Sequence, residues 1–133
     1  MHRGLYRITR GRFGLRRPKA QQWGMFRLTT TGRRSGQSRS VILAYLEDGP
    51  NLVTLAMNGW GEAEPAWWLN LQANPDARAD LPDGSRLVRC RAAEGAERDR
   101  LWQLWRETNA DLDAFAARRP TPTAVVVLER RPG

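Results

Sequence analysis

Histidine and cysteine are nearly absent from this chain of 133 residues, and their scarcity excludes several kinds of site. The single histidine, His2, stands at the start of the chain, so we expect neither a zinc site nor a Ser-His-Asp triad, and no other metal site. The single cysteine, Cys90, rules out a disulfide within the chain. It lies in the strand-like segment "RLVRCRAA", where we expect a structural thiol, with a reactive thiol as the alternative.

Long hydrophobic runs are missing as well. No run reaches the roughly 20 apolar residues of a membrane-spanning helix, and no apolar stretch follows the N-terminus as in a secretory signal. The expected location is therefore the cytoplasm. Yet 41% of the residues are hydrophobic and six are tryptophan, so we expect one domain with a packed core and not a disordered chain.

Acidic residues are outnumbered, and this imbalance favours anionic partners. The chain has 22 lysine and arginine residues against 14 acidic ones, which gives a formal net charge of +8. Such a charge suits nucleic acid, anionic lipid or a phosphate-bearing ligand, without choosing among them.

Hydrophobic patterning predicts a mainly β domain of the α+β class. The segments rich in β-branched and aromatic residues alternate with the turn signals "DGP" and "PDG", which is typical of hairpins. The predicted strands are residues 23–30, 40–47, 51–57, 77–81, 85–93 and 123–129, and the predicted helices are residues 65–74, 94–108 and 110–119. Six mostly antiparallel strands with two to four helices predict a small barrel whose openings the helices cover.

The first 21 residues differ from the rest and are expected to form a basic arm or helix ahead of a single domain at 22–133. Residues 1–19 are rich in arginine and contain no acid, and Leu5, Ile8, Arg12 and Leu15 follow roughly helical spacing. One interpretation is a solvated helix or frayed arm. The other is a basic amphipathic segment that contacts anionic lipid or covers the site.

The segment "TTTGRRSGQSR", residues 29–39, concentrates arginine in a short loop after a strand. Like charges this close repel each other, so the cluster predicts an anionic ligand among them. Arginine makes bidentate, charge-assisted hydrogen bonds to phosphate and carboxylate, and the glycines let backbone N–H groups approach such a ligand.

This loop, the segment "NGWGEAEPAWWLNLQANPDA" and the late strand "TAVVVLE" occur in an order that resembles the deazaflavin-dependent nitroreductase family. The resemblance covers about residues 22–130. Its most specific part is the spacing that places Pro65, Trp67, Asn70, Leu71, Asn74 and Pro75 after the arginine loop.

The resemblance implies a split β-barrel like that of the FMN-binding reductases, and coenzyme F-420 as the cofactor. This ligand has a flat deazaflavin ring at one end and a phosphate with a glutamate tail at the other. By resemblance, the residues that bind the phosphate and tail are Arg33, Arg34, Ser35, Gly36, Gln37 and Arg39. Those expected near the ring are Ala56, Met57, Asn58, Gly59, Pro65, Ala66, Trp67 and Asn70.

The resemblance also implies hydride transfer from reduced F-420 to a small organic acceptor, such as a quinone or a nitroaromatic compound. The cofactor performs the difficult step, so no catalytic side chain is assigned. The source organism must make F-420, which points to actinobacteria.

The chain departs from the family on the acceptor side. Met57 and Trp60 stand where serine and glycine are common, and no tyrosine follows Tyr45. We therefore expect an apolar acceptor pocket formed by Met57, Trp60, Leu112 and Phe115, and the missing hydroxyls put nitroreduction in doubt.

Other interpretations remain open on the sequence. A non-catalytic F-420 carrier would also lack those hydroxyls, and a related split barrel could use FMN or haem breakdown products. A nucleic-acid-binding module could use the basic arm and the arginine loop, but most tryptophans fall at apolar positions of helices or strands, so no nucleic acid is predicted. The expected assembly is a monomer or a homodimer, with possible peripheral membrane contact through the basic arm.

Overall fold

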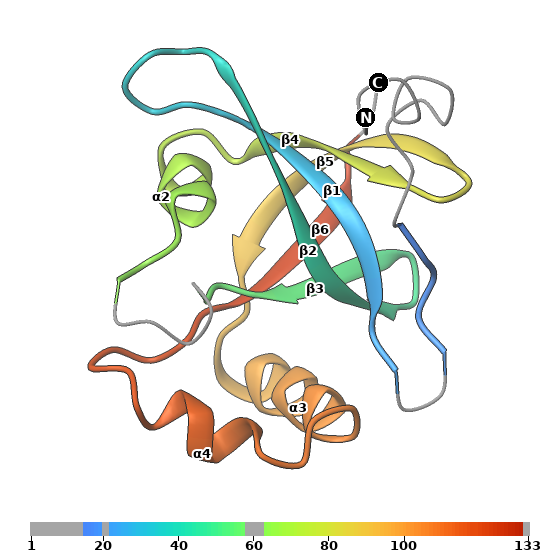
Figure 1. Cartoon of the computed structure of the whole chain (residues 1–133), viewed down its shortest axis with the longest axis vertical. Coiled ribbons are helices and arrows are strands. Elements are labelled where there is room, and N and C mark those ends of the chain that lie inside the picture. The colour runs from blue at the N-terminus through green and yellow to red at the C-terminus, as the bar shows by residue number, and fades with distance from the viewer. Residues whose placement is uncertain (1–14, 20–21, 58–62, 132–133) are drawn as a thin grey trace, which may run out of the picture.

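A computed structural model describes residues 15–19, 22–57 and 63–131 of the chain. The elements run in the order β1 (Gly24–Thr31), β2 (Ser38–Asp48), β3 (Asn51–Leu55), α2 (Ala66–Ala73), β4 (Asp76–Leu81), β5 (Gly84–Ala92), α3 (Gly95–Arg106), α4 (Leu112–Ala116) and β6 (Val125–Arg130). Figure 1 shows the strands curled around one another, with α3 and α4 together on one side and α2 beside the β1–β2 loop.

The six strands close into an antiparallel barrel in the order β1-β2-β3-β6-β5-β4. Pairing of Arg27 with Asp80 and of Thr29 with Arg78 joins β1 to β4 and completes the closure. The predicted mainly β barrel of six strands with covering helices is thereby confirmed.

Two hydrophobic cores lie on the two faces of the barrel wall. The inner core fills the barrel with residues such as Phe26 and Leu28, and Trp68 of α2 closes it. The outer core packs Leu101 and Trp105 of α3 against the outside of the wall. Strand β6 belongs to both cores, so its residues Val125–Leu128 are all buried, which explains its uninterrupted apolar run.

The barrel is split along one strand. Strand β2 pairs with β1 from Ser38 to Tyr45, but its described pairing with β3 covers only Leu46–Asp48. Beyond that point the described contacts include a side-chain hydrogen bond from Thr54 Oγ1 to the Ala44 carbonyl at 2.7 Å. One edge of β2 thus faces away from the ladder and is open to a ligand.

Residues 15–19 run back along the start of β1. Arg16 and Lys19 form antiparallel bridges with Met25 and Gln22, so of the two predicted forms, arm or helix, residues 15–19 take the extended one. The rest of the arm, residues 1–14 and 20–21, lies outside the described residues. Gly24 permits the close approach, because an added Cβ would lie 2.6 Å from the Arg16 carbonyl.

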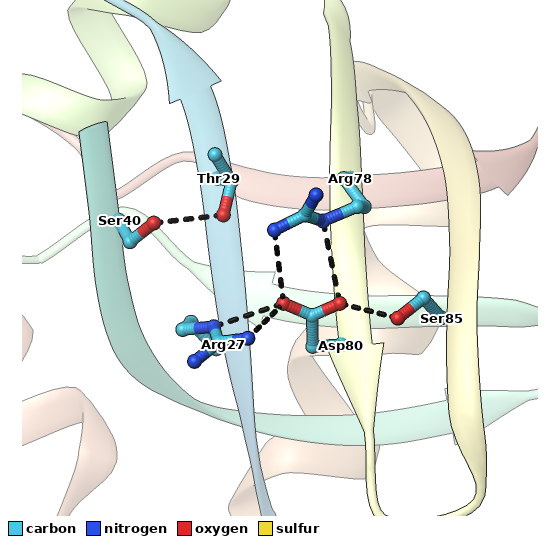
Figure 2. Close-up of polar contacts among 6 residues, drawn as sticks. All are labelled: Arg27, Thr29, Ser40, Arg78, Asp80 and Ser85. Carbon is cyan, nitrogen blue, oxygen red and sulfur yellow. Dashed lines mark hydrogen bonds and ion pairs between the residues drawn. The ribbon is translucent and has the colours of Figure 1, made fainter. Parts of the chain in front are cut away.

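The buried carboxylate of Asp80 links β1, β4 and β5 at the seam where the barrel closes (Figure 2). Asp80 accepts two hydrogen bonds from Arg27, at 2.6 and 2.9 Å, and one from the Ser85 hydroxyl at 2.5 Å. Arg78 adds an ion pair at 3.3 Å. Burial by itself raises the pKa of Asp80, but the hydrogen bonds from Ser85 and Arg27 outweigh it, so this pKa lies below the ordinary value. The carboxylate is therefore ionised and neutralised where the barrel closes.

None of the helices in the described residues has the length and hydrophobicity that a bilayer crossing requires.

Candidate functional site

The open edge of β2 borders a cavity of about 620 Å³. The cavity lies between this edge, the β1–β2 loop, the start of α2 and the end of β3, and α3 contributes one side chain. Its lining comprises Thr30, Gly32, Arg33, Arg34, Ser35, Arg39, Ser40, Val41, Ile42, Leu43, Ala44, Thr54, Leu55, Met57, Pro65, Ala66, Trp67, Asn70 and Trp105. Its volume is typical of sites that hold a small molecule or cofactor.

One end of the cavity is cationic. Arg33, Arg34 and Arg39 all come from the β1–β2 loop and its junction with β2, and all are exposed. Among the described residues, no acidic side chain forms an ion pair with any of the three. Their charge is thus available to an anionic ligand.

The arginine loop is held in a tight turn by its own backbone. Gly32 donates to the Gln37 carbonyl at 2.7 Å and accepts from the Gly36 N–H at 2.8 Å, and the Gln37 N–H donates to Ser35 Oγ at 3.1 Å. Gly36 has a φ of 73°, which a side chain would disfavour. The glycines noted in the sequence therefore shape the loop that presents the arginines.

Asn70 of α2 ties this loop to the barrel. Its Oδ1 accepts hydrogen bonds from the backbone N–H of Arg33 at 3.1 Å and from the guanidinium of Arg33 at 3.0 Å. Its Nδ2 donates to Thr30 Oγ1 at 3.2 Å. Asn70 and Thr30 are both buried, so the amide is fixed at both ends and orients Arg33 at the cavity wall.

The other end of the cavity is apolar. Leu43 and Ala44 on β2, Leu55 and Met57 at the end of β3, and Trp67 on α2 form its walls. Trp67 and the adjacent Trp68 are both buried and both belong to the inner core, but of the two the described lining includes only Trp67.

Trp105 is one of the lining residues that the sequence analysis did not predict. It lies on the same helix face as Leu101 and Trp102, a pattern that indicates core packing and carries no signal for a cavity. Its indole N–H is the one buried side-chain polar atom without a hydrogen-bond partner in the described part of the chain. A buried donor without a partner is costly, and a ligand oxygen would relieve that cost.

The predicted site residues fall into four groups. Arg33, Arg34, Ser35, Arg39, Met57, Pro65, Ala66, Trp67 and Asn70 share the one cavity. Gly36, Gln37 and Ala56 lie beside it without lining it, and Asn58, Gly59 and Trp60 lie outside the described residues. Leu112 and Phe115 do not line it either.

The placement of Leu112 and Phe115 does not match the predicted acceptor pocket. Leu112 is fully buried in the outer core, where α4 packs on α3. Phe115 is half-buried and packs under the guanidinium of Arg118. The short helix α4 directs Leu112 into the outer core, and the described lining of the cavity includes Met57 and Trp105 instead of these two residues.

The cavity fits a deazaflavin coenzyme in its chemistry. A flat apolar ring matches the walls around Leu43, Met57 and Trp67, and a phosphate with a carboxylate tail matches the three arginines of the β1–β2 loop at the other end. The indole N–H of Trp105, which has no hydrogen-bond partner among the described residues, would suit a carbonyl oxygen of an acceptor bound beside such a ring. In the described ranges no three His, Cys, Asp or Glu side chains lie together as metal ligands.

Comparisons with known proteins agree with this geometry. Residues 1–130 match the family model described as F-420H(2)-dependent quinone reductase. An F-420H(2)-dependent quinone reductase of Mycobacterium tuberculosis is 35% identical over 134 residues, which cover 98% of this chain and 89% of that protein.

Solved structures share the fold at lower identity. A structure described as a domain-swapped dimer superposes with a TM-score of 0.77 at 27% identity and covers 96% of both chains. The structure of an F-420-dependent reductase superposes with a TM-score of 0.71, also at 27% identity, and covers 79% of this chain and 93% of that one. The chain therefore belongs to the F-420H(2)-dependent quinone reductase family and is an oxidoreductase that uses coenzyme F-420.

Proposed function

We propose that the protein reduces a quinone with reduced F-420 in the cavity at the open edge of β2. The observation that carries this proposal is that one cavity combines three arginines with an apolar wall. Among the described residues, the arginines have no ion-pair partner and the Trp105 N–H in the wall has no hydrogen-bond partner. A nitroaromatic compound is the less suitable acceptor, because the described wall around Met57 and Trp105 presents one unmatched N–H and no tyrosine hydroxyl.

The residues of the chain have distinct tasks in this mechanism. When bound, reduced F-420 supplies the hydride from C5 of its ring. Arg33, Arg34 and Arg39 bind the phosphate and the carboxylate tail through charge-assisted hydrogen bonds. Met57 and Trp67 pack on the ring and exclude water, so that the acceptor stacks at the short distance that hydride transfer requires.

Titration with oxidised F-420 should quench the tryptophan fluorescence of the protein saturably, whereas FMN should not. Trp67 and Trp105 line the cavity, so a bound ring would lie next to two emitters. FMN has one phosphate and no glutamate tail, so it leaves part of the arginine loop unused. Quenching by FMN alone would contradict the proposal, and tight F-420 binding without turnover of any quinone would identify a carrier.

Trp105→Phe should raise the KM for the quinone by about 3- to 10-fold and leave the affinity for F-420 unchanged, because one hydrogen bond to the acceptor is lost. Trp102→Phe is the matched control, since the Trp102 N–H is already bonded to Asp113 at 2.8 Å and Trp102 is not part of the described lining. Steady-state kinetics at saturating F-420 measures both. An equal KM in the two variants and the wild type would exclude Trp105 as a donor.

The oligomeric state of the protein and its contact with a membrane are two further proposals. A homodimer is favoured over a monomer, since one structurally similar protein is described as a domain-swapped dimer. Peripheral membrane contact through the basic arm stays a prediction, because residues 1–14 lie outside the described part of the chain.

A further inference from the structure

Arg119 joins three segments that are far apart in the sequence. It lies in the connection between α4 and β6, and its side chain is 0% exposed. One guanidinium nitrogen donates to the Ala56 carbonyl at 3.0 Å and to Thr123 Oγ1 at 2.9 Å. The other forms an ion pair with the carboxylate of Glu64. A single buried cation thus bridges the end of β3, the start of α2 and the approach to β6.

The two outer segments of this bridge continue into the walls of the cavity. Ala56 directly precedes Met57, and Glu64 directly precedes Pro65 and Ala66, and these three neighbours all line the cavity. Arg119 itself does not belong to the described lining. We therefore expect it to act on the cavity through the positions of the segments that it holds.

The remaining contacts of the bridge keep it in place. The Thr123 carbonyl accepts a hydrogen bond from Arg98 of α3 at 2.7 Å, and the Ala56 N–H donates to the Ala124 carbonyl at 2.9 Å. The approach to β6 is thereby fixed to α3 and to the end of β3. A buried guanidinium is costly unless its N–H donors have hydrogen-bond partners. The guanidinium of Arg119 therefore strongly favours the arrangement in which Ala56, Thr123 and Glu64 accept from it.

We propose that Arg119 is a positioning residue for hydride transfer, because it sets the separation between the end of β3 and the start of α2. This rests on the proposed function, in which Met57 and the start of α2 contact the deazaflavin ring. Lysine keeps the charge but has one nitrogen, so it cannot bridge the Ala56 carbonyl and the Glu64 carboxylate with the same geometry. The ring end of the ligand should respond to this change, and the tail end should not.

The test compares Arg119→Lys with Arg27→Lys, a matched loss of a buried arginine fork. The Arg27 side chain is 12% exposed and pairs with Asp80 at the barrel seam, outside the described lining of the cavity. Binding is measured with F-420 and with its ribityl-deazaflavin fragment, which lacks phosphate and tail. Thermal unfolding is measured on both variants.

Arg119→Lys should weaken binding of F-420 and of the fragment by the same factor, and should lower kcat for quinone reduction by roughly 10- to 100-fold, as misplaced reacting groups do. Arg27→Lys should lower the Tm without changing either affinity or kcat. Glu64→Gln keeps a side chain of the same shape and should shift both affinities in the same direction as Arg119→Lys. If Arg119→Lys does not fold, Glu64→Gln tests the positioning role in its place.

The positioning role would be overturned if Arg119→Lys folds and has the affinities and kcat of the wild type. If Arg119→Lys does not fold, the same result in Glu64→Gln would overturn it. Either result would leave the proposed function intact. Failure of the wild-type protein itself to bind F-420 would overturn both. A loss of F-420 affinity in Arg119→Lys with unchanged fragment affinity would also contradict the proposal, since it would place the effect at the tail.

Discussion

Asp80→Asn should lower the free energy of unfolding by about 3 kcal/mol, because removing one partner of a buried ion pair leaves the other charge uncompensated. Asp80 is 3% exposed and neutralises Arg27 where β1 meets β4, and Figure 2 shows Arg78 and Ser85 on the same carboxylate. The substitution preserves the shape of the side chain, so the loss reports on charge and hydrogen bonding. Urea denaturation followed by tryptophan fluorescence measures the change.

An exposed ion pair provides the control for this prediction. Glu47 pairs with Arg17 at 3.4 Å, and these side chains are 38% and 63% exposed. Glu47→Gln should change the free energy of unfolding by less than about 1 kcal/mol, because solvent screens such pairs. Equal losses in the two variants would contradict the importance assigned to the seam.

The same carboxylate predicts a pH dependence. Although burial raises the pKa of Asp80, the Ser85 and Arg27 hydrogen bonds hold it below its ordinary value of 3.8, so its stabilisation is present above that value and is lost as the pH falls through the folded pKa. The difference in unfolding free energy between the wild type and Asp80→Asn should therefore be full at pH 6 and shrink in acid. A difference that stays constant down to the acid transition would show that ionisation of Asp80 is not its source.

Asn70→Leu should weaken F-420 binding by about 10- to 100-fold, since the amide that fixes the arginine loop is lost and the Arg33 donors are left without their partner. The leucine side chain has a similar size, so the helix face stays filled. The backbone N–H and the guanidinium of Arg33 both depend on Asn70 Oδ1, and the loop should move away from the cavity without them. Titration with F-420 measures the affinity.

Two comparisons make this second prediction specific to the loop. The ribityl-deazaflavin fragment has no phosphate or tail, so its affinity should be the same in Asn70→Leu and in the wild type. Gln72→Leu, at an exposed position of the same helix, should leave both affinities unchanged. A parallel loss of F-420 and fragment binding in Asn70→Leu would mean that α2 itself had moved.

Local patterns in the sequence predicted the elements well, and the differences at their ends have tertiary causes. Strand β2 begins at Ser38, two residues before the predicted start, because it pairs with the whole of β1 up to Thr31. The helix predicted at residues 110–119 is shortened to Leu112–Ala116. Arg119 lies beyond its end, where the bridge to Ala56 and Glu64 fixes the chain.

Contacts between distant residues account for what the sequence did not reveal about the site. The loop arginines were recognisable because they are neighbours in the sequence, whereas the contact of Asn70 with Arg33 spans 37 positions and that of Arg119 with Ala56 spans 63. Trp105 follows the same spacing as a core residue, and the cavity that it lines is formed by segments distant from it in the sequence. Leu112 shows the converse, because it was expected in the acceptor pocket but packs in the outer core.

The double burial of β6 has a consequence for the order of folding. Leu52 of β3 pairs with Leu128 of β6, far later in the chain, and β6 supplies side chains to the barrel interior and to the layer under α3. Neither core is complete until this late strand has docked, so a growing polypeptide on the ribosome keeps both apolar surfaces exposed through most of its synthesis. Such non-local pairing is typical of slow folding, and its last step should assemble both cores together.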